Sequence, residues 1–518
     1  MQNRRESPFR IPGVCSLAAI AFGAALMLAG PAPVQAQTAA QSAPAPLMDP
    51  AFWQAQALKD LIPYWAAHAP DPENGAFFMN LSRDWKPLPP WDKVPALISR
   101  HVFGFSAAYL LSGEPKYLDI ARQGADYLYQ HAWDPEYGGW FDKLARDGGP
   151  LVETKSISLQ LYTNVGLTAY YIASGDERAL SLVRKSVDIQ RTKGFDAAKG
   201  GYVQALNRDL SVANYGKNKH AHYGYIGSLL LNLYLATGDP GVLAWERELA
   251  DLSLARMMDK FGWIHGFRSL FDRDWRRAPA LVDGNEVVSV GAELTAALAF
   301  LRLYHQTGEK KYLDAGRRLG DQVTRSGFDP GRGCWYDLIA TAPPHRPVAK
   351  PTVWWWVQIY GSFLQLQLYR VTGDEACLDT FRRSEEFFDS FFRDREQGGV
   401  FGSVTPDGRV MGEGRKASDS EWHTSYHETE HALLNYLYLN LYVNRRPAVL
   451  YYRLDGPGTH FVALVDDPAV RISGVTMDGE PWKDFDGAKR SVNVPAGQAH
   501  AVRVTFVPGT PAPRAPNR

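Results

Sequence analysis

The chain has 518 residues, 56 Lys and Arg against 56 Asp and Glu, and 45% hydrophobic residues. This composition excludes disordered, collagen-like and disulfide-stapled proteins. A formal net charge of zero offers no basic stripe that would neutralise phosphates, so nucleic acid is not an expected partner. A polysaccharide or a small neutral ligand fits the composition better.

The first 36 residues are predicted to form an export signal. Arg4, Arg5 and Arg10 precede an apolar run from Val14 to Ala29, and the small-residue site Val34-Gln35-Ala36 follows. We expect cleavage after Ala36 and a periplasmic or secreted protein. The apolar run is shorter than the roughly 20 residues that span a bilayer, so stable membrane insertion is not expected. The sequence does not indicate an oligomeric state.

Two cysteines, Cys334 and Cys377, lie beyond the predicted signal. Export permits a disulfide between them, but one pair in a chain of this length is no framework, and their spacing matches no zinc motif. We therefore expect two buried thiols or one optional bridge.

Two sequence elements recur with a common period of about 65 residues. In the first element, Tyr is followed four residues later by Gly and then by an acidic residue. Its copies are Tyr109/Gly113/Glu114, Tyr171/Gly175/Asp176, Tyr234/Gly238/Asp239, Tyr304/Gly308/Glu309 and Tyr369/Gly373/Asp374. In the second, Asp is followed by Gly, at Asp71/Gly75, Asp134/Gly138, Asp196/Gly200, Asp329/Gly333 and Asp394/Gly398, with a shortened copy at Asp259/Gly262. Two independent elements with one period indicate a repeated structural unit.

Between these elements the apolar residues have helical spacing, so each repeat is predicted to be two helices. The Gly supplies a left-handed turn that ends the first helix, and the acidic residue suits the start of the second. The sequence thus predicts a mainly α domain of six helical hairpins over residues 48–445. We favour closure as an (α/α)6 toroid over an open solenoid, because the first and last copies lack the polar character of capping repeats.

Alternating residues and turn signals follow from Arg446, as in Ser491–Val494 and Val502–Phe506. We predict a small β module over residues 446–508 that packs on the helical domain, and a disordered Pro-rich tail over 509–518.

Polar residues occur about 9 to 12 positions before each repeated Tyr. They are Arg100, Gln160, His222, Glu293 and Gln358, with His431 as a sixth member if Tyr442 takes the same role. Singly, such residues are often caps or core groups. Six of them among apolar neighbours would be costly without a shared polar purpose, so we expect them to converge on one axial pocket. Trp354, Trp355, Trp356 and Trp422 fall at or near the same level.

Several motifs resemble one known family. They are Arg100–Ser106 with Ala108-Tyr109, Tyr137–Asp142, Lys155 with Gln160, Asn218–His222, Trp355–Gln358 and Trp422–His427. Over residues 48–445 the chain resembles the N-acylglucosamine 2-epimerase family, which includes cellobiose 2-epimerases and mannose isomerases on an (α/α)6 barrel. The β module is not covered by this resemblance.

The resemblance implies an enzyme that moves a proton at C2 of a reducing sugar or oligosaccharide. Residues matching Arg100, His222, Glu293, Trp356, Trp422 and His427 would bind the sugar and act on it. His427 would be the general base or acid at C2, His222 would assist ring opening, and Arg100 would hold the enediolate oxygen. Further substrate-binding positions are Gln160, Asn218, His220, Trp355 and Gln358. Abstraction of a proton next to a carbonyl needs a base with a pKa near neutrality, which His supplies, and a cation to stabilise the oxyanion; no metal or redox cofactor is required.

Three positions depart from the family pattern. Val290 stands where family epimerases carry a His, and Tyr225 and Tyr360 replace two acids. Inversion at C2 needs proton-transfer groups on both faces of the planar intermediate, and we expect one of them to be absent here. Isomerisation from C2 to C1 can proceed with a single base, which keeps both an epimerase and an aldose–ketose isomerase as interpretations.

Two other functions remain as alternatives. A glycoside hydrolase or lyase on the same barrel would use paired carboxylates among Glu286, Glu293, Glu428 and Glu430. A carbohydrate-binding protein would keep the pocket without the chemistry. His427 to His431 also spells H-E-x-x-H, but Glu430 puts a charge where that zinc motif is apolar and no third ligand is evident, so no metal is expected.

Overall fold

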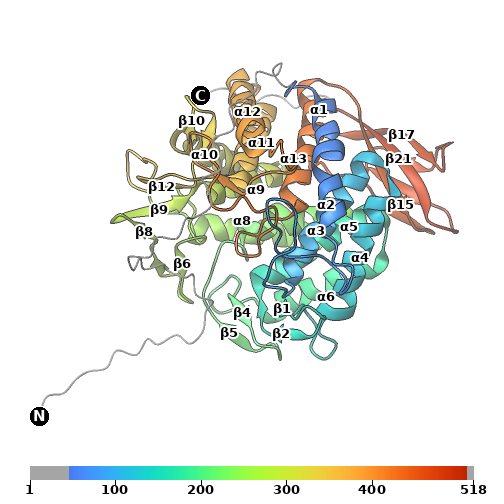
Figure 1. Cartoon of the computed structure of the whole chain (residues 1–518), viewed down its shortest axis with the longest axis horizontal. Coiled ribbons are helices and arrows are strands. Elements are labelled where there is room, and N and C mark those ends of the chain that lie inside the picture. The colour runs from blue at the N-terminus through green and yellow to red at the C-terminus, as the bar shows by residue number, and fades with distance from the viewer. Residues whose placement is uncertain (1–45, 510–518) are drawn as a thin grey trace, which may run out of the picture. The chain divides into compact units, whose positions relative to one another are not determined.

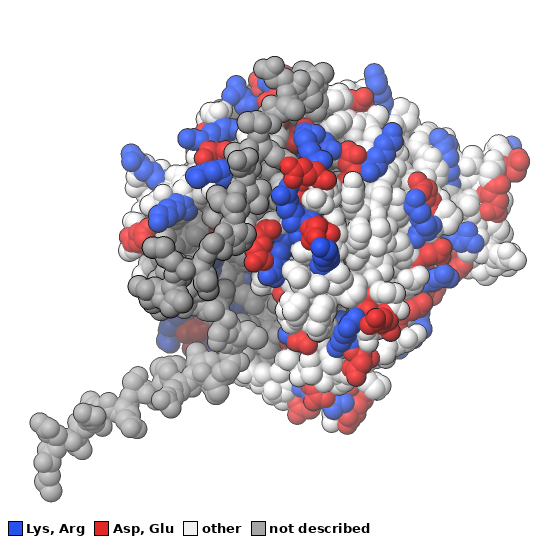
Figure 2. All heavy atoms as spheres, viewed as in Figure 1, with Lys and Arg blue, Asp and Glu red and all other residues white. Residues whose placement is uncertain are grey.

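A computed structural model describes residues 46–509 (Figure 1). The predicted export signal, residues 1–36, and residues 510–518 of the predicted tail lie outside this range. The described chain belongs to one compact unit, with helices up to Val443 and strands from Ala448 to Val507. Within residues 46–509, no helix has the length and apolar character needed to cross a membrane. Lys and Arg are interspersed with Asp and Glu on the face shown in Figure 2.

Five helical hairpins follow one another along the chain. They are α3 (Pro95–Ser112) with α4 (Pro115–Tyr127), α5 (Ile157–Ser174) with α6 (Glu177–Lys193), α7 (Leu231–Thr237) with α8 (Pro240–Arg256), α9 (Val290–Thr307) with α10 (Lys310–Gly327), and α11 (Trp355–Thr372) with α12 (Glu375–Phe387). The Gly after each first helix has a left-handed backbone. At Gly113, φ is 71° and the N–H donates to the carbonyl of Tyr109 at 2.7 Å. The predicted role of the Tyr and Gly element is confirmed.

The sixth pair of helices is not a hairpin. α13 (Ser425–Tyr438) packs against α1 (Pro50–Ala55) and α2 (Ile62–His68), beside which it lies in Figure 1. Trp65 on α2 donates through Nε1 to the carboxylate of Glu428 on α13 at 2.8 Å. The prediction of six hairpins is corrected: five are hairpins, and the sixth pair joins the two ends of the helical region. π-Helical segments extend several helices, η1 (Gln56–Leu61), η2 (Leu128–Ala132), η3 (Tyr225–Leu230), η4 (Phe388–Phe392) and η5 (Leu439–Val443).

The six helices α3, α5, α7, α9, α11 and α13, here called the inner helices, contact one another in a closed circuit. α3 contacts α5, α5 contacts α7 and η3, η3 contacts α9, α9 contacts α11, α11 contacts α13, and α13 contacts α3. Each inner helix is reached from the preceding outer helix by a long loop that contains one copy of the Asp and Gly element. Equivalent ends of the inner helices therefore face the same set of loops.

Ion pairs link successive loops. Asp71 accepts from Arg146, Asp134 from Arg208, and Asp196 from Arg273, and each of these Arg residues belongs to the next repeat. Asp394 of the last loop accepts from Arg83 of the first loop at 2.8 Å. The same two loops meet where the N–H of Leu81 donates to the carbonyl of Ala417 at 3.1 Å. The contact between repeats thus runs from the last loop back to the first.

Short antiparallel strands order the loops. They are β1 (Lys143–Leu144), β2 (Pro150–Val152), β3 (Lys155–Ser156), β4 (Ala205–Leu206), β5 (Val212–Asn214), β6 (Leu270–Phe271), β7 (Arg277–Ala278), β8 (Leu281–Val282), β9 (Asn285–Ser289), β10 (Phe328–Asp329), β11 (Cys334–Trp335), β12 (Leu338–Ala340), β13 (Val353–Trp354) and β14 (Ser403–Val404). Cys334 is buried, Cys377 is half-buried, and both are free thiols.

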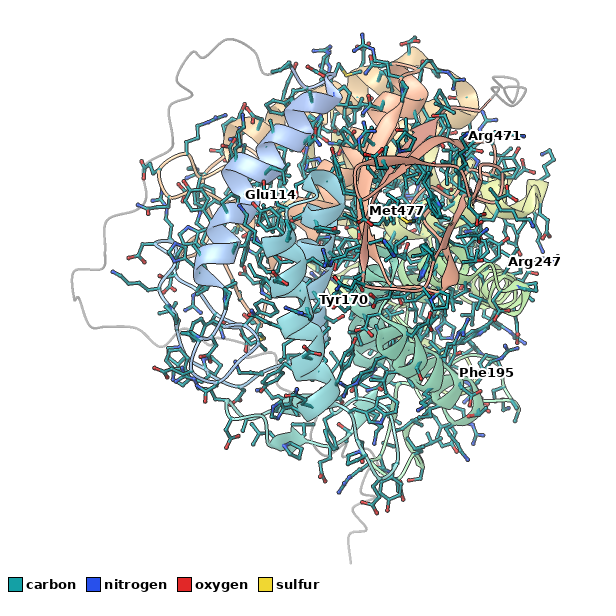
Figure 3. All side chains as sticks on the ribbon, turned by 90° about the vertical axis from the view of Figure 1, so that its right-hand side faces the viewer. Glu114, Tyr170, Phe195, Arg247, Arg471 and Met477 are labelled. Atoms are coloured by element: carbon teal, nitrogen blue, oxygen red, sulfur yellow. The ribbon has the colours of Figure 1, made fainter. Side chains whose placement is uncertain are left out.

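The C-terminal strands form two antiparallel sheets. One has the order β15-β21-β17-β18 and the other β16-β20-β19. The strands are β15 (Ala448–Leu454), β16 (Gly458–Phe461), β17 (Arg471–Met477), β18 (Glu480–Trp482), β19 (Phe485–Asp486), β20 (Ser491–Val494) and β21 (His500–Val507). Both segments predicted as strands, Ser491–Val494 and Val502–Phe506, lie in strands. Figure 3 faces this side of the molecule, with Arg471 and Met477 labelled on β17.

These strands pack on the tight turns of the first three inner helices. Tyr451 lies against Gly113, His460 against Gly175 and Phe461 against Gly238, so closely that a β carbon on any of the glycines would lie about 3 Å from these rings. Small size and a left-handed backbone thus both favour Gly at these turns. The strands therefore cover the ends of α3, α5 and α7 that are opposite to the long loops.

Candidate active site

A circuit of six side chains surrounds the axis at the loop end of the inner helices. The members, here called the site circuit, are Arg100, Tyr162, His220, Phe267, Trp356 and His427, and each contacts the next with the last returning to the first. Four of them, Tyr162, His220, Phe267 and Trp356, are only partly buried. Solvent therefore reaches these four side chains, and the space that the site circuit surrounds is called the recess below.

Arg100 and His427 are joined by a hydrogen bond that fixes the state of the imidazole. Nη2 of Arg100 donates to Nε2 of His427 at 2.7 Å. Because a guanidinium has no acceptor, Nε2 must carry a lone pair and the ring proton must reside on Nδ1. Nδ1 in turn donates to Glu430 at 3.2 Å, one turn along α13. His427 is thus a neutral imidazole whose basic nitrogen faces a cation.

Glu430 gathers three donors at the back of His427. The hydroxyls of Tyr360 and Tyr426 each donate to its carboxylate at 3.2 Å, in addition to Nδ1 of His427. Burial raises the pKa of Glu430 to about 7, against the lowering effects of Arg302, the two tyrosines and Arg100. A carboxylate behind a His orients the ring and stabilises the imidazolium that forms when the His accepts a proton.

Burial and nearby cations also tune the bases of the site. Burial, with Arg100, His423 and Lys219, holds the pKa of His427 well below its usual 6.5. Burial and Lys219 do the same for His220. Burial lowers the pKa of Lys219 to about 7, opposed only by the field of Glu293. The site therefore presents two neutral imidazoles and an ammonium that loses its proton near neutrality.

Trp422 adopts an unusual backbone next to these groups. Its φ is 59°, in the left-handed region that side chains other than Gly rarely enter. Its carbonyl accepts a hydrogen bond from Nη1 of Arg100, and its ring lies 5.4 Å from the guanidinium carbon and 5.3 Å from Tyr162. Such strain costs about 1–3 kcal/mol and is often retained at functional sites.

Four of the predicted pocket residues instead hold the loops. Gln160, His222, Glu293 and Gln358 each accept the backbone N–H of the residue two positions after the Gly of the preceding Asp and Gly element. The donors are Trp140 at 2.8 Å, Tyr202 at 3.0 Å, Ile264 at 2.9 Å and Trp335 at 3.0 Å, respectively. These polar side chains do share one role, as expected, but the role is to hold the loops and not to line the pocket. The prediction that the whole ring converges on the pocket is corrected accordingly.

His222 is fully used by this arrangement. Its Nδ1 donates to the carbonyl of Asn218, and its Nε2 accepts from Tyr202, so neither ring nitrogen is available to a sugar. Burial lowers its pKa to about 4. Its predicted part in ring opening therefore has no support in this geometry. Asn218 caps the same turn by accepting the N–H of Ala221 at 3.1 Å.

Other predicted residues lie behind the site circuit. His431 donates to buried Glu385 on α12 at 2.8 Å and packs against Trp53 and Phe388, so it does not reach the pocket. Trp355 is 1% exposed and packs beneath His427 with ring centroids 6.0 Å apart. Of the predicted site residues, the structure brings together Arg100, His220, Trp356, Trp422 and His427.

Tyr162, Phe267 and Lys219 were not among the predicted site residues, and Glu430 was predicted only as a carboxylate of the hydrolase alternative. Spacing contained part of the signal for Glu430, because a carboxylate three residues after a first-turn His shares its helix face. Phe267 lies in a loop without a repeated neighbour, and no local pattern marks it. The Arg that links each loop to the one before does recur in sequence, as Arg83-Asp84, Arg146-Asp147, Arg208-Asp209 and Arg273-Asp274.

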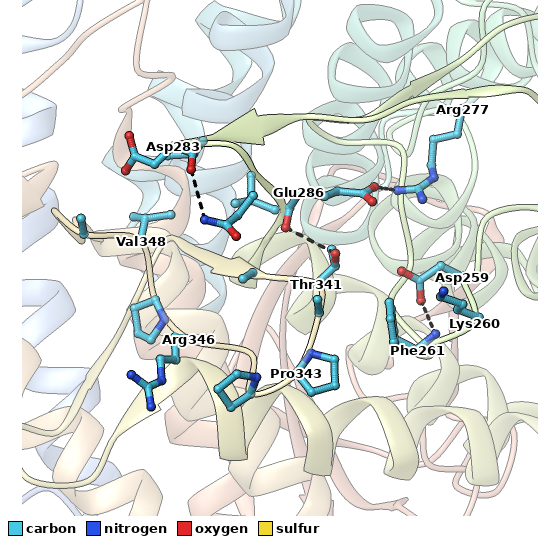
Figure 4. A pocket seen from close by; sticks show the side chains of 18 residues that line it. Asp259, Lys260, Phe261, Arg277, Asp283, Glu286, Thr341, Pro343, Arg346 and Val348 are labelled. Carbon is cyan, nitrogen blue, oxygen red and sulfur yellow. Dashed lines mark hydrogen bonds and ion pairs between the residues drawn. The ribbon is translucent and has the colours of Figure 1, made fainter.

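A separate cavity of about 920 Å³ lies between the loops near residues 259–261, 277–287 and 340–349 (Figure 4). Glu286, a candidate carboxylate of the hydrolase alternative, borders it and forms an ion pair with Arg277. No member of the site circuit lines this cavity. It is therefore distinct from the candidate active site.

Two further carboxylates of the hydrolase alternative, Glu293 and Glu428, have separate structural partners. Glu428 is 1% exposed and accepts from Trp65 and His423, while Glu293 accepts from Ile264. His427 and His431 of the H-E-x-x-H segment turn to different carboxylates, Glu430 and Glu385. Within residues 46–509, no group of three or more His, Cys, Asp or Glu side chains is placed to hold a metal ion.

Two known proteins with similar sequences are 2-epimerases. A cellobiose 2-epimerase of Bacteroides fragilis is 26% identical over 380 residues, which cover 71% of this chain and 93% of the relative. An N-acylglucosamine 2-epimerase of Bos taurus is 24% identical over 377 residues, covering 69% and 84% of the two chains.

Solved structures share the fold. A D-mannose isomerase superposes with a TM-score of 0.67 at 20% identity, covering 75% of this chain and 98% of that one. A cellobiose 2-epimerase from Spirochaeta thermophila gives 0.66 at 22% identity, covering 75% and 96%. The profile of N-acylglucosamine 2-epimerase (GlcNAc 2-epimerase) matches residues 75–427, more than half of the 518. The chain belongs to the N-acylglucosamine 2-epimerase family.

Proposed function

We propose that this protein is an exported, cofactor-independent epimerase or aldose–ketose isomerase that moves a proton at C2 of a reducing sugar or oligosaccharide. The observation that carries the proposal is the hydrogen bond from Arg100 to the unprotonated Nε2 of His427. It puts a neutral base and a permanent cation at one point of a solvent-reached recess. These are the two groups that proton abstraction next to a carbonyl requires.

Each group has one part in the proposed reaction. The carbonyl oxygen of the open-chain sugar takes the place of His427 as the acceptor from Arg100, which frees the Nε2 lone pair. His427 then removes the C2 proton, and Arg100 stabilises the enediolate oxygen. Glu430 holds the ring through Nδ1 and stabilises the imidazolium while it carries the proton. The reaction closes when the proton returns to carbon.

Aromatic faces around the recess suit a sugar. Tyr162, Phe267, Trp356 and Trp422 are partly exposed and surround the Arg100 and His427 pair. Sugar rings present C–H faces that pack on such surfaces, while their hydroxyls need polar partners such as His220. The substrate class named for the relatives, a reducing hexose or a disaccharide such as cellobiose, fits this lining.

The proposal includes an (α/α)6 toroid over residues 48–445, supported by the closed circuit of inner-helix contacts and the pair Arg83–Asp394. A glycoside hydrolase on the same barrel is less well supported, because Glu286, Glu293 and Glu428 are engaged by separate partners away from one cavity. A carbohydrate-binding protein without chemistry would not need the arrangement of Arg100, His427 and Glu430.

Incubation in D2O with cellobiose, N-acetylglucosamine and D-mannose, followed by NMR, tests the proposal. We expect deuterium at C2 of at least one sugar, together with a new epimer or a ketose. New reducing ends without deuterium would indicate a hydrolase instead. Line broadening without any chemical change would indicate a binding protein.

A further inference from the structure

Inversion at C2 needs a proton donor on the face opposite to the base. His427 can serve one face. Val290, where the resemblance implies a His in family epimerases, is 0% exposed and has no titrating group. Trp356 packs directly on Gly291, the residue after Val290, so the wall beside this position is the Trp356 ring. A substitute donor must reach the recess from this wall.

Lys219 occupies that place. Its Nζ lies 4.7 Å from the centroid of the Phe267 ring and 5.8 Å from that of Trp356, two adjacent members of the site circuit. The residue is 4% exposed. Within residues 46–509 no side chain or carbonyl accepts a hydrogen bond from the ammonium, and the one carboxylate whose field acts on it is Glu293.

Lys219 lies beside Phe267, which is on the opposite side of the site circuit from Arg100. Phe267 is three contacts from Arg100 in either direction, through Tyr162 and His220 or through His427 and Trp356. Arg100 and Nε2 of His427 therefore mark one side of the recess, and the Phe267 corner with Lys219 marks the other.

We infer that Lys219 is the second proton-transfer residue, which protonates the face of C2 opposite to His427 and makes the enzyme a true epimerase. This inference rests on the proposed function and deepens it. Nε2 of His427 takes the C2 proton and becomes imidazolium, and the C2–H electron pair passes into the enediolate. The ammonium of Lys219 then gives a proton to the other face of C2 and becomes a neutral amine. Exchange with water returns both groups to their starting states.

The pKa shifts support Lys219 as the proton donor and His427 as the base. An amine whose pKa is lowered to about 7 is partly protonated at neutrality, and its ammonium form releases the proton readily. His220, the other candidate on this side, has a pKa well below 6.5 and so carries no extra proton to give. Its Nδ1 lies 3.5 Å from the hydroxyl of Tyr162, which suits contact with a sugar hydroxyl.

The test separates exchange from inversion in Lys219→Met, which keeps an unbranched apolar stem against Phe267 and Trp356. Each epimer of a sugar that the parent turns over, chosen from cellobiose, N-acetylglucosamine and D-mannose, is incubated in D2O. We expect Lys219→Met to slow formation of the other epimer by about 10²-fold or more. C2 exchange with retention, in the epimer whose proton faces His427, should stay within about threefold of the parent. The neighbouring variant His220→Gln should lower both rates by the same factor.

Three results would overturn the inference. The first is normal epimer formation by Lys219→Met, and the second is an equal loss of exchange and inversion at an unchanged melting temperature. The third is a parent enzyme that makes only a ketose, which would leave the proposed function standing without a second donor. A parent that exchanges no C2 proton in any of the three sugars would instead refute the proposed function itself.

Discussion

The guanidinium of Arg100 donates to Nε2 of His427 at 2.7 Å, although the two residues are 327 positions apart and lie on the first and last inner helices. Their meeting depends on the contact of α3 with α13, and so on closure of the helix circuit. The base and its cation are therefore assembled only when the ends of the helical region come together.

Replacement of His427 separates chemistry from folding. His427→Asn should lower turnover by about 10²- to 10⁴-fold because a positioned base is lost. His431→Ala, one helical turn further, should keep most of the turnover per folded molecule. It should lower the free energy of unfolding by about 1–3 kcal/mol, because buried Glu385 loses a donor. Steady-state kinetics and urea unfolding of both variants check this, and a reversed pattern would contradict the site assignment.

Glu430 predicts the pH dependence of C2 exchange. Its folded pKa of about 7 lies above the usual 4.5 of a Glu side chain, so it is protonated at pH 5 and ionises as the pH rises through 7. The carboxylate stabilises the imidazolium of His427, so exchange should rise with pH and level off above about 8. Glu430→Gln should be slower and lack this limb. Because folding raises the pKa, the same ionisation should lower parent stability between about pH 4.5 and 7, and Glu430→Gln should remove that decline.

His222 is expected to act through structure. His222→Ala leaves the buried N–H of Tyr202 without its acceptor, which should lower the free energy of unfolding by about 1–3 kcal/mol. Turnover of the folded variant should fall much less than in His427→Asn. Thermal melts and kinetics on the same preparation decide the matter. A large loss of turnover at an unchanged melting temperature would restore a catalytic part for His222.

Local geometry was predictable from the sequence, whereas the direction of side chains was not. The Gly113 turn and the β20 strand follow from left-handed backbone and alternation, which are properties of adjacent residues. The sequence also placed Gln160 and Glu293 correctly at the loop end of their helices. A period along a helix does not indicate, however, whether a polar side chain accepts from a loop N–H or lines a pocket. The pairing of α1 with α13 depends on contacts across the whole helical region, which no local pattern contains.

Arg83 and Asp394 should stabilise the closure. Although burial raises the pKa of Asp394, hydrogen bonds from Arg83 and Lys416 lower it from the usual 3.8 of an Asp side chain to about 2. The lowered pKa contributes about 2 kcal/mol to the free energy of unfolding above pH 4, and this contribution is lost as the pH falls toward 2. Arg83→Ala should speed hydrogen exchange in residues 50–68 and 425–438. Arg146→Ala, the equivalent change between the first two loops, should not. Equal exchange in both variants would contradict a special part for this pair.

The rate of deuterium incorporation at C2 in D2O, compared between the parent and His427→Asn, tests the central claim most directly. The sugar is one of cellobiose, N-acetylglucosamine and D-mannose, with unfolding curves recorded for both proteins. The account predicts exchange by the parent and a loss of about 10²-fold or more in the variant at nearly unchanged stability. Exchange at the parental rate in folded His427→Asn would contradict it.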